Sequence, residues 1–258
     1  MKNPKKIVIK IGTNAITDEA GVLDLDIIEC LARQIAEAKN GGKKIVIVTS
    51  GAIGAGIGEL GLGSRPDNIV MRQACAAVGQ GILMAKYHSI FGKYGMKVAQ
   101  VLITYNTFTN KDTLNNMSNN LNKLLEMGVI PIINENDAIA VEEIGKSFGD
   151  NDMISAKLAV QINADLLIIL TDVEGLYDRN PKDGKATLIK EASKIGEKMA
   201  NMAGKSSLGV GGMKSKIQAA GIAAKQGVNV IIANGRKENV LANLLKGKRE
   251  GTTFLAKS

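Results

Sequence analysis

Aromatic side chains are scarce in this sequence. Its 258 residues include no tryptophan, four phenylalanines and four tyrosines, although the formal net charge is +8. Proteins that bind single-stranded nucleic acids combine basic grooves with aromatic side chains on which the bases stack. The lysines here are spread along the whole chain, which is equally typical of solvated surfaces and of a general attraction for anionic metabolites. We therefore expect no nucleic-acid partner.

Cysteine and histidine are also rare. Cys30 and Cys75 lie far apart and His88 is the only histidine, so neither a zinc site nor a Ser/His/Asp arrangement is indicated. The lack of paired cysteine motifs fits a reducing compartment. No apolar run is long enough to span a membrane, and the run near the N-terminus is too short for a signal peptide. We expect a cytoplasmic protein that does not associate with a membrane.

Strand and helix patterns alternate along the chain. Apolar, β-branched runs predict strands at residues 5–11, 44–48, 98–104, 129–133, 166–170, 228–233 and 252–255. Helical spacing of apolar residues predicts helices at residues 25–39, 68–94, 114–125, 153–162, 213–226 and 240–245. Strand, helix and strand in this order form parallel, right-handed units. The sequence therefore predicts an α/β enzyme.

Polar and glycine residues follow directly after the predicted strands. The carboxyl ends of parallel strands share one edge of a sheet, where ligands bind in this class of fold. Small residues at strand ends are also ordinary turn residues, but charged groups among them favour a site. The five groups are Gly12-Thr13, Ser50-Gly51, Asn134 to Asp137, Thr171-Asp172 and Asn234-Gly235.

Two common nucleotide-binding patterns are not supported. The P-loop pattern G-x-x-x-x-G-K-[ST] is absent. Residues 56–61 satisfy G-x-G-x-x-G, but they begin several residues past the strand and no acidic residue stands at the expected distance. The pattern is therefore interpreted as a product of the high glycine content, which argues against a nicotinamide enzyme and a P-loop kinase.

Lysines and glycine-rich turns suggest an anion site instead. Lys10 stands between two isoleucines. It either places its ammonium group where ligands bind, at the carboxyl ends of the strands, or lies on the solvated face of an edge strand. Lys214 and Lys216 open a helix after a glycine-rich loop, which indicates a phosphate site or a flexible loop with solvated lysines. Ser50-Gly51 and the glycines that follow predict either an anion-binding nest or tight helix packing.

Asp152 is the candidate carboxylate beside these lysines and glycines. It either caps the helix that follows it or takes part in the site. Lysines, glycine loops, a carboxylate and no covalent nucleophile fit phosphoryl transfer, which needs mainly positioning and charge neutralisation.

These motifs also carry a resemblance. VIKIGT, IVIVTSGAIGAG, PIINENDA, FGDNDMISA, ILTDVEGLY and GVGGMKSKIQAA resemble, in order, the motifs of the glutamate 5-kinases in the amino acid kinase family. The resemblance implies a three-layer αβα sandwich with a mainly parallel, roughly eight-stranded central sheet. It implies one amino acid kinase domain over residues 1–258, with a glutamate lobe at about 1–165 and an ATP lobe at about 166–258.

The resemblance implies ATP-dependent phosphorylation of the L-glutamate γ-carboxylate, the first step of proline biosynthesis, with ATP and Mg2+. Lys10 and Lys216 would stabilise the transferring phosphoryl group, and Asp152 would orient both lysines. Gly12 and Gly51 would offer backbone N–H groups to the phosphoryl oxygens.

Glutamate and ATP would be held by separate sets of residues. Asp137 would receive the glutamate ammonium group, within a set made of Ser50, Asn134, Asp137, Asp150 and Asn151. ATP would contact Thr171, Asp172, Gly211, Gly212, Met213, Lys214, Ser215 and Lys216. Mg2+ would be held by the ATP phosphates and water, without protein ligands.

The resemblance further implies proline as a feedback inhibitor, a homo-oligomer (dimer or tetramer) and functional coupling to glutamate-5-semialdehyde dehydrogenase. The chain ends at Ser258, so we expect no C-terminal PUA domain, an RNA-binding-like module of many relatives. Val210 and Lys214 depart from the family pattern. The alternatives are a kinase for acetylglutamate, aspartate, carbamate or UMP, or a non-catalytic amino-acid or nucleotide sensor on the same fold.

Overall fold

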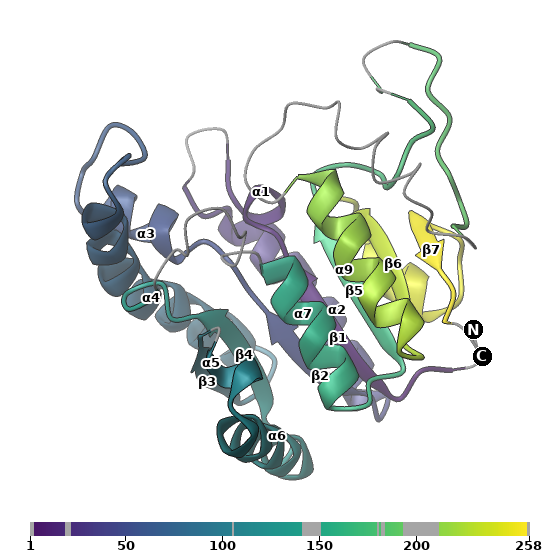
Figure 1. The fold of residues 1–258 in the computed structure, drawn as a ribbon, viewed down its shortest axis with the longest axis horizontal. Coiled ribbons are helices and arrows are strands. Elements are labelled where there is room, and N and C mark those ends of the chain that lie inside the picture. The colour runs from purple at the N-terminus through teal and green to yellow at the C-terminus, as the bar shows by residue number, and fades with distance from the viewer. Residues whose placement is uncertain are drawn as a thin grey trace.

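A single sheet crosses the molecule (Figure 1). The structure is a computed structural model that describes residues 3–18, 22–104, 106–140, 151–179, 181, 184–192 and 212–256. Within these residues the sheet has seven strands in the order β3-β4-β2-β1-β5-β6-β7. Their bounds are β1 (Lys6–Ile11), β2 (Lys44–Val48), β3 (Val98–Ile103), β4 (Ile130–Glu135), β5 (Leu166–Thr171), β6 (Asn229–Asn234) and β7 (Thr252–Phe254).

Strands β1 to β6 are parallel, and β7 pairs antiparallel with β6. The expectation of a mainly parallel sheet is confirmed, with seven strands in the described residues where about eight were expected. Strand β1 lies between β2 and β5. The interpretation of Lys10 as part of an edge strand is therefore wrong.

Helices cover both faces of the sheet (Figure 1). The helices after the first strand are α1 (Thr13–Ile16), α2 (Leu25–Asn40), α3 (Ala52–Glu59), α4 (Ile69–Gly92), α5 (Asn106–Thr109), α6 (Lys111–Glu126), α7 (Asn151–Gln161), α9 (Met213–Lys225) and α10 (Val240–Leu245). One buried cluster joins the sheet to α6, α7 and α9. A second joins it to α2, α4 and α10. The αβα sandwich is confirmed.

Side chains along β1 point alternately to the two faces of the sheet, and so to the two helical layers. Ile7, Ile9 and Ile11 belong to the cluster with α2 and α10, whereas Val8 belongs to the cluster with α7 and α9. Side chains two residues apart on a strand share a face. Lys10 therefore lies on the same face as Val8, against the layer that contains α7 and α9.

The glycine-rich residues after Gly51 form helix α3, which the sequence did not predict. A Cβ atom on Gly56 would lie 1.9 Å from the Cys75 carbonyl oxygen, and one on Gly79 would lie 1.9 Å from the Ala52 carbonyl oxygen. These glycines are required because α3 and α4 pack backbone against backbone. Tight helix packing, one of the two alternatives drawn from the sequence, is confirmed at Gly56, and the anion-binding nest at Ser50-Gly51 stays a prediction.

None of the helices in the described part of the chain combines the length and the apolar character that a membrane crossing requires.

Candidate active site

Two lysines from different elements share one buried carboxylate. The Nζ atom of Lys10 lies 2.7 Å from Oδ1 of Asp152, and the Nζ atom of Lys216 lies 2.9 Å from Oδ2. The exposed fractions are 5% for Lys10, 0% for Asp152 and 7% for Lys216. We call this arrangement the lysine triad.

Each member of the triad is placed by the element that carries it. Lys10 lies near the carboxyl end of β1, and Asp152 lies in the first turn of α7. A carboxylate is favourable at that position because the N-terminus of a helix carries a partial positive charge. Lys216 lies in the first turns of α9, where a cation is unfavourable, and Gly212 supplies no side-chain cap. Its pairing with Asp152 offsets that unfavourable position.

Opposing effects act on the ionisation of Asp152. Burial by itself raises the pKa of this carboxyl, but the charges and hydrogen bonds of Lys10 and Lys216 outweigh burial and hold the pKa below its usual value. Asp152 is therefore ionised at neutral pH, and its negative charge keeps two cationic groups close to each other.

The two glycines expected to contact the phosphoryl oxygens, Gly12 and Gly51, lie just after β1 and β2. The N–H group of Gly12 donates to the Leu170 carbonyl oxygen at 3.0 Å, so the donor expected to face a phosphoryl oxygen is engaged in this structure. A Cβ atom on Gly12 would lie 3.4 Å from Nζ of Lys10. Gly51 has a φ of 103° and precedes α3 without a side-chain cap, so only glycine suits this turn.

Three of the residues predicted to hold glutamate lie together. Nδ2 of Asn151 donates to the Thr49 carbonyl oxygen at 2.8 Å, to Ser50 Oγ at 3.0 Å and to Asn134 Oδ1 at 3.0 Å. The other amide atom, Asn151 Oδ1, is buried and has no hydrogen-bond partner among the described residues. It is available to a donor on a ligand. Asp150 lies outside the described residues.

Asp137 follows the end of β4 and is partly buried. Burial raises its pKa to about 6, against a smaller lowering by the charge of Arg65. The free protein thus holds a carboxylate that is poorly solvated and would gain from a cationic ligand. Sequence reasoning missed Arg65, which stands in a loop with no strand end beside it.

The predicted ATP residues begin at the end of β5. Thr171 Oγ1 donates to Oδ1 of Asp172 at 3.0 Å, and Asn14 Nδ2 donates to Oδ2 of Asp172 at 3.3 Å. These contacts link the end of β5 to helix α1, which follows β1.

At α9 the two lysines have different surroundings, because Lys214 is exposed and Lys216 is buried. Gly212, Met213 and Ser215 lie at the same helix start. Val210 and Gly211 lie outside the described residues.

Arg236, which the sequence did not single out, joins two of the strand ends. Its Nε donates to the Asn14 carbonyl oxygen at 3.0 Å, and its guanidinium group also donates to the Thr17 carbonyl oxygen. Its only sequence signal was its position directly after Asn234-Gly235.

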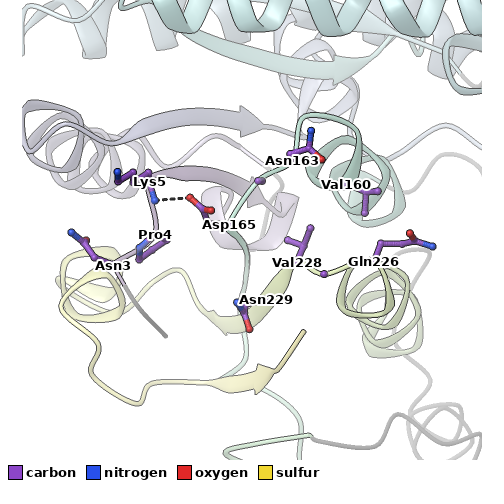
Figure 2. Close-up of a pocket in the computed structure, with 11 residues that line it drawn as sticks. Asn3, Pro4, Lys5, Val160, Asn163, Asp165, Gln226, Val228 and Asn229 are labelled. Atoms are coloured by element: carbon purple, nitrogen blue, oxygen red, sulfur yellow. Dashed lines mark hydrogen bonds between the residues drawn. The ribbon is translucent and has the colours of Figure 1, made fainter. Parts of the chain in front are cut away.

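A cavity of about 540 Å3 opens at the opposite, amino-terminal edge of the sheet (Figure 2). Asp165 lines it, and its Oδ2 accepts the backbone N–H groups of Lys5 at 2.7 Å and Lys6 at 2.8 Å. This carboxylate therefore anchors the start of β1. The cavity lies away from the lysine triad, and we assign the chemistry to the triad edge.

Comparisons with known proteins identify the family of this chain. A sequence model described as amino acid kinase family matches residues 5–234. The glutamate 5-kinase of Clostridium acetobutylicum is 47% identical over 261 residues, which cover 100% of this chain and 97% of the relative. The glutamate 5-kinase of Caldanaerobacter subterraneus subsp. tengcongensis is 48% identical over 254 residues, which cover 97% of this chain and 68% of the relative.

Solved structures share the fold at low sequence identity. A UMP kinase from Bacillus anthracis has a TM-score of 0.67 at 16% identity, covering 100% of this chain and 98% of that one. A carbamate kinase from Giardia lamblia bound to AMP-PNP has a TM-score of 0.69 at 17% identity, covering 100% of both chains. The resemblance seen in the sequence motifs is confirmed: the chain belongs to the amino acid kinase family, among relatives that are glutamate 5-kinases.

Proposed function

We propose that this chain transfers the γ-phosphoryl group of ATP to the γ-carboxylate of L-glutamate, forming L-glutamyl 5-phosphate and ADP in the first step of proline biosynthesis. The observation that carries the proposal is the lysine triad, in which β1, α7 and α9 bring two buried ammonium groups to one carboxylate. The identity to glutamate 5-kinases over the whole chain supports the choice of substrate.

In this reaction an oxygen of the γ-carboxylate attacks the γ-phosphorus, and the bond from that phosphorus to the β–γ bridging oxygen breaks. The γ-carboxylate is ionised at neutral pH, so no general base is needed. Lys10 and Lys216 neutralise the negative charge on the transferring group, and Asp152 holds their ammonium groups in place.

ATP enters as its magnesium complex. Within the described residues, no group of three or more His, Cys, Asp and Glu side chains is placed to hold a metal ion. Mg2+ is commonly bound through substrate phosphates and water, and we assign it to the ATP phosphates. The polar groups of Thr171 and Asp172 and the start of α9 form the ATP side, in the lobe of about residues 166–258.

The amino-acid side lies in the lobe of about residues 1–165. Buried Asn151 Oδ1 requires a hydrogen-bond donor, and the carboxyl of Asp137, whose pKa burial raises to about 6, favours a cation. The free ammonium group of L-glutamate supplies both. An acetylated amino group has one donor and no charge, and carbamate and UMP carry no ammonium group. This contrast favours glutamate over acetylglutamate, carbamate and UMP.

The chain also carries an apolar surface that fits a homo-oligomer, which we place at the start of α4. Val70 is 66% exposed, as is Ile139, and Ile69 and Met71 are exposed beside Val70. Gln73 Nε2 donates to the Ala140 carbonyl oxygen at 3.0 Å, which joins the two segments. Exposed apolar groups gathered in this way mark association surfaces. Light scattering should show a dimer or tetramer, and a monomer after Val70→Glu.

A hydroxylamine trap tests the activity. Purified protein with MgATP and L-glutamate should yield γ-glutamyl hydroxamate and ADP in equal amounts. Parallel reactions with acetylglutamate, aspartate, carbamate and UMP separate the other kinases of the family. ADP formation with one of these and none with glutamate would reassign the acceptor. Binding of ligands without any turnover would favour the sensor.

The same assay run with added proline tests feedback inhibition, which rests on the family resemblance, as does the coupling to glutamate-5-semialdehyde dehydrogenase. The cytoplasmic location rests on the lack of paired cysteine motifs and of a signal peptide in the sequence. Loss of hydroxamate formation as proline is raised is the expected result. Unchanged rates at millimolar proline would remove proline as a regulator of this chain.

A further inference from the structure

Four carboxamide side chains form one continuous hydrogen-bonded row, which we call the amide row. Asn151 of α7 donates to Asn134 of β4 at 3.0 Å, and Asn134 donates to Gln80 of α4 at 2.9 Å. Gln80 in turn donates to Gln100 of β3 at 3.1 Å. In each pair the NH2 group of one amide meets the oxygen of the next, so the row has a direction.

Backbone groups fix that direction at the inner end. The N–H group of Glu135 donates to Asn134 Oδ1 at 3.0 Å, so the oxygen of this amide cannot exchange places with its nitrogen. The Thr49 carbonyl oxygen accepts from Asn151 Nδ2 at 2.8 Å, which fixes the second amide in the same way. A backbone N–H can only donate and a carbonyl oxygen can only accept. Asn151 Oδ1 is thereby directed away from the row, as the free acceptor described above.

Gln80 supplies the acceptor that this arrangement requires. Asn134 is 1% exposed, so water cannot replace a partner lost by its NH2 group. The amide of Asn134 cannot rotate to avoid the loss, because Glu135 holds its oxygen. A hydrocarbon at position 80 would leave a buried donor unsatisfied, which is costly. Asn134 would then have to move, together with the Asn151 amide that rests on it.

We propose that Gln80 is a positioning residue for the amino-acid substrate, acting through Asn134 to hold the free oxygen of Asn151 where the substrate ammonium group binds. This rests on the proposed function. Gln80 belongs to α4, outside the strand ends that carry the rest of the site. Gln100 is exposed and orients the Gln80 amide, so its replacement has a smaller effect because water substitutes for it.

The test compares Gln80→Met with Gln80→Glu. Methionine keeps the length of the side chain and replaces the carbonyl oxygen with a thioether sulfur, which is only a weak acceptor, whereas glutamate keeps an oxygen toward Asn134. Gln161→Met is the control, because Gln161 is also partly buried and its replacement removes a hydrogen bond to a side chain outside the amide row, Ser118 Oγ at 3.1 Å. It lies at the far end of α7 from Asn151.

Gln80→Met should raise the KM for L-glutamate about 10-fold, as expected for one unsatisfied buried donor. Its kcat and its KM for ATP should stay within about twofold of the unchanged protein, because the triad is untouched. Gln80→Glu should restore the KM for glutamate to within about threefold, and Gln161→Met should leave it unchanged. Melting temperatures of the two methionine variants should fall by similar amounts.

Calorimetric titration with L-glutamate in the absence of ATP gives a readout that needs no turnover. The Kd of Gln80→Met should rise by the same factor as its KM. An unchanged Kd and KM in Gln80→Met, or an equal rise in Gln80→Glu, would overturn the positioning role while leaving the kinase activity in place. If the unchanged protein neither binds glutamate nor forms hydroxamate, the proposed function fails first and the positioning role falls with it.

Discussion

Replacing Lys10 with methionine removes one positive charge from the lysine triad and keeps the length of the side chain. The lost ammonium group lies 2.7 Å from Asp152 in the free protein. In the proposed reaction it would act on the transferring phosphoryl group at a similarly short range. Two unit charges about 4 Å apart at an effective dielectric constant of about 20 interact by about 4 kcal/mol. Removal of one charge stabiliser from an active site costs about 10²–10³ in kcat, or about 2.7–4 kcal/mol. Both values predict a kcat lower by about 10²–10³.

The fold should tolerate this change. Asp152 keeps Lys216 at 2.9 Å, so the loss in unfolding free energy should stay below the roughly 3–5 kcal/mol that follows when a buried charge loses its partner. Lys6→Met is the matched control. Lys6 lies on the same face of β1, and its Nζ donates to the Ile162 carbonyl oxygen at 2.6 Å, at the other end of the strand.

Initial rates of hydroxamate formation over a range of glutamate and ATP concentrations separate kcat from KM. Lys10→Met should lower kcat with little change in either KM, and Lys6→Met should lower neither. Urea unfolding of each variant shows that the folded state is populated. A normal kcat with a raised KM for ATP would refute transition-state stabilisation and leave Lys10 as a residue that binds ATP in the ground state.

Three further predictions concern Asp137, Asp152 and Gly79. The pKa of Asp137 is about 6, so the carboxyl loses its charge as pH falls through about 6 and the KM for glutamate should rise. The KM of the Asp137→Asn variant should not depend on pH in this range. Burial raises this pKa above its unfolded value, so ionisation of the carboxyl lowers the unfolding free energy as pH rises from about 4 to 6. Asp137→Asn should therefore stabilise the free protein at pH 7 by up to about 3 kcal/mol. Equal urea midpoints for the variant and the unchanged protein would contradict this. Asp152→Asn should abolish turnover and lower the unfolding free energy by about 3–5 kcal/mol, since two buried lysines lose their counter-charge. Full activity of this variant would show that Asp152 does not organise the two lysines. The lowered pKa of Asp152 contributes stability above its unfolded pKa of about 3.9 that is lost as pH falls through the folded value. Gly79→Ala should separate α3 from α4 and lower the unfolding free energy by at least about 1–3 kcal/mol. Gly81→Ala is the control: its added Cβ meets open space, so the unfolding free energy should not fall in this way.

The alternation of apolar runs was sufficient to predict the strands of the sheet. For example, residues 44–48 were predicted as a strand and form β2 (Lys44–Val48). β4 was predicted to end at residue 133 but continues to Glu135. The difference arises because Asn134 and Glu135 are polar yet buried, and a hydrophobic pattern cannot show that hydrogen bonds will satisfy them.

Helix α3 escaped prediction because three of its eight residues are glycine, which disfavours an isolated helix. It forms because its backbone packs against α4 at Cys75 and Gly79, and a pattern of apolar residues within α3 alone does not show that contact. Lys10 was ambiguous for a similar reason: only the position of β1 between β2 and β5 excludes an edge strand. Gln80 and Gln100 carried no signal, since a glutamine on a helix or strand usually faces solvent.

The central claim, attack of the glutamate γ-carboxylate on the γ-phosphorus of ATP beside the lysine triad, can be tested by following one oxygen atom. L-Glutamate labelled with oxygen-18 in the γ-carboxylate is incubated with MgATP, the protein and hydroxylamine in unlabelled water. Hydroxylamine attacks the carbonyl carbon of the acyl phosphate, so the phosphate released retains the bridging oxygen that came from glutamate. Mass spectrometry should find one oxygen-18 atom in that phosphate. Phosphate without the label would mean that water, not glutamate, receives the phosphoryl group.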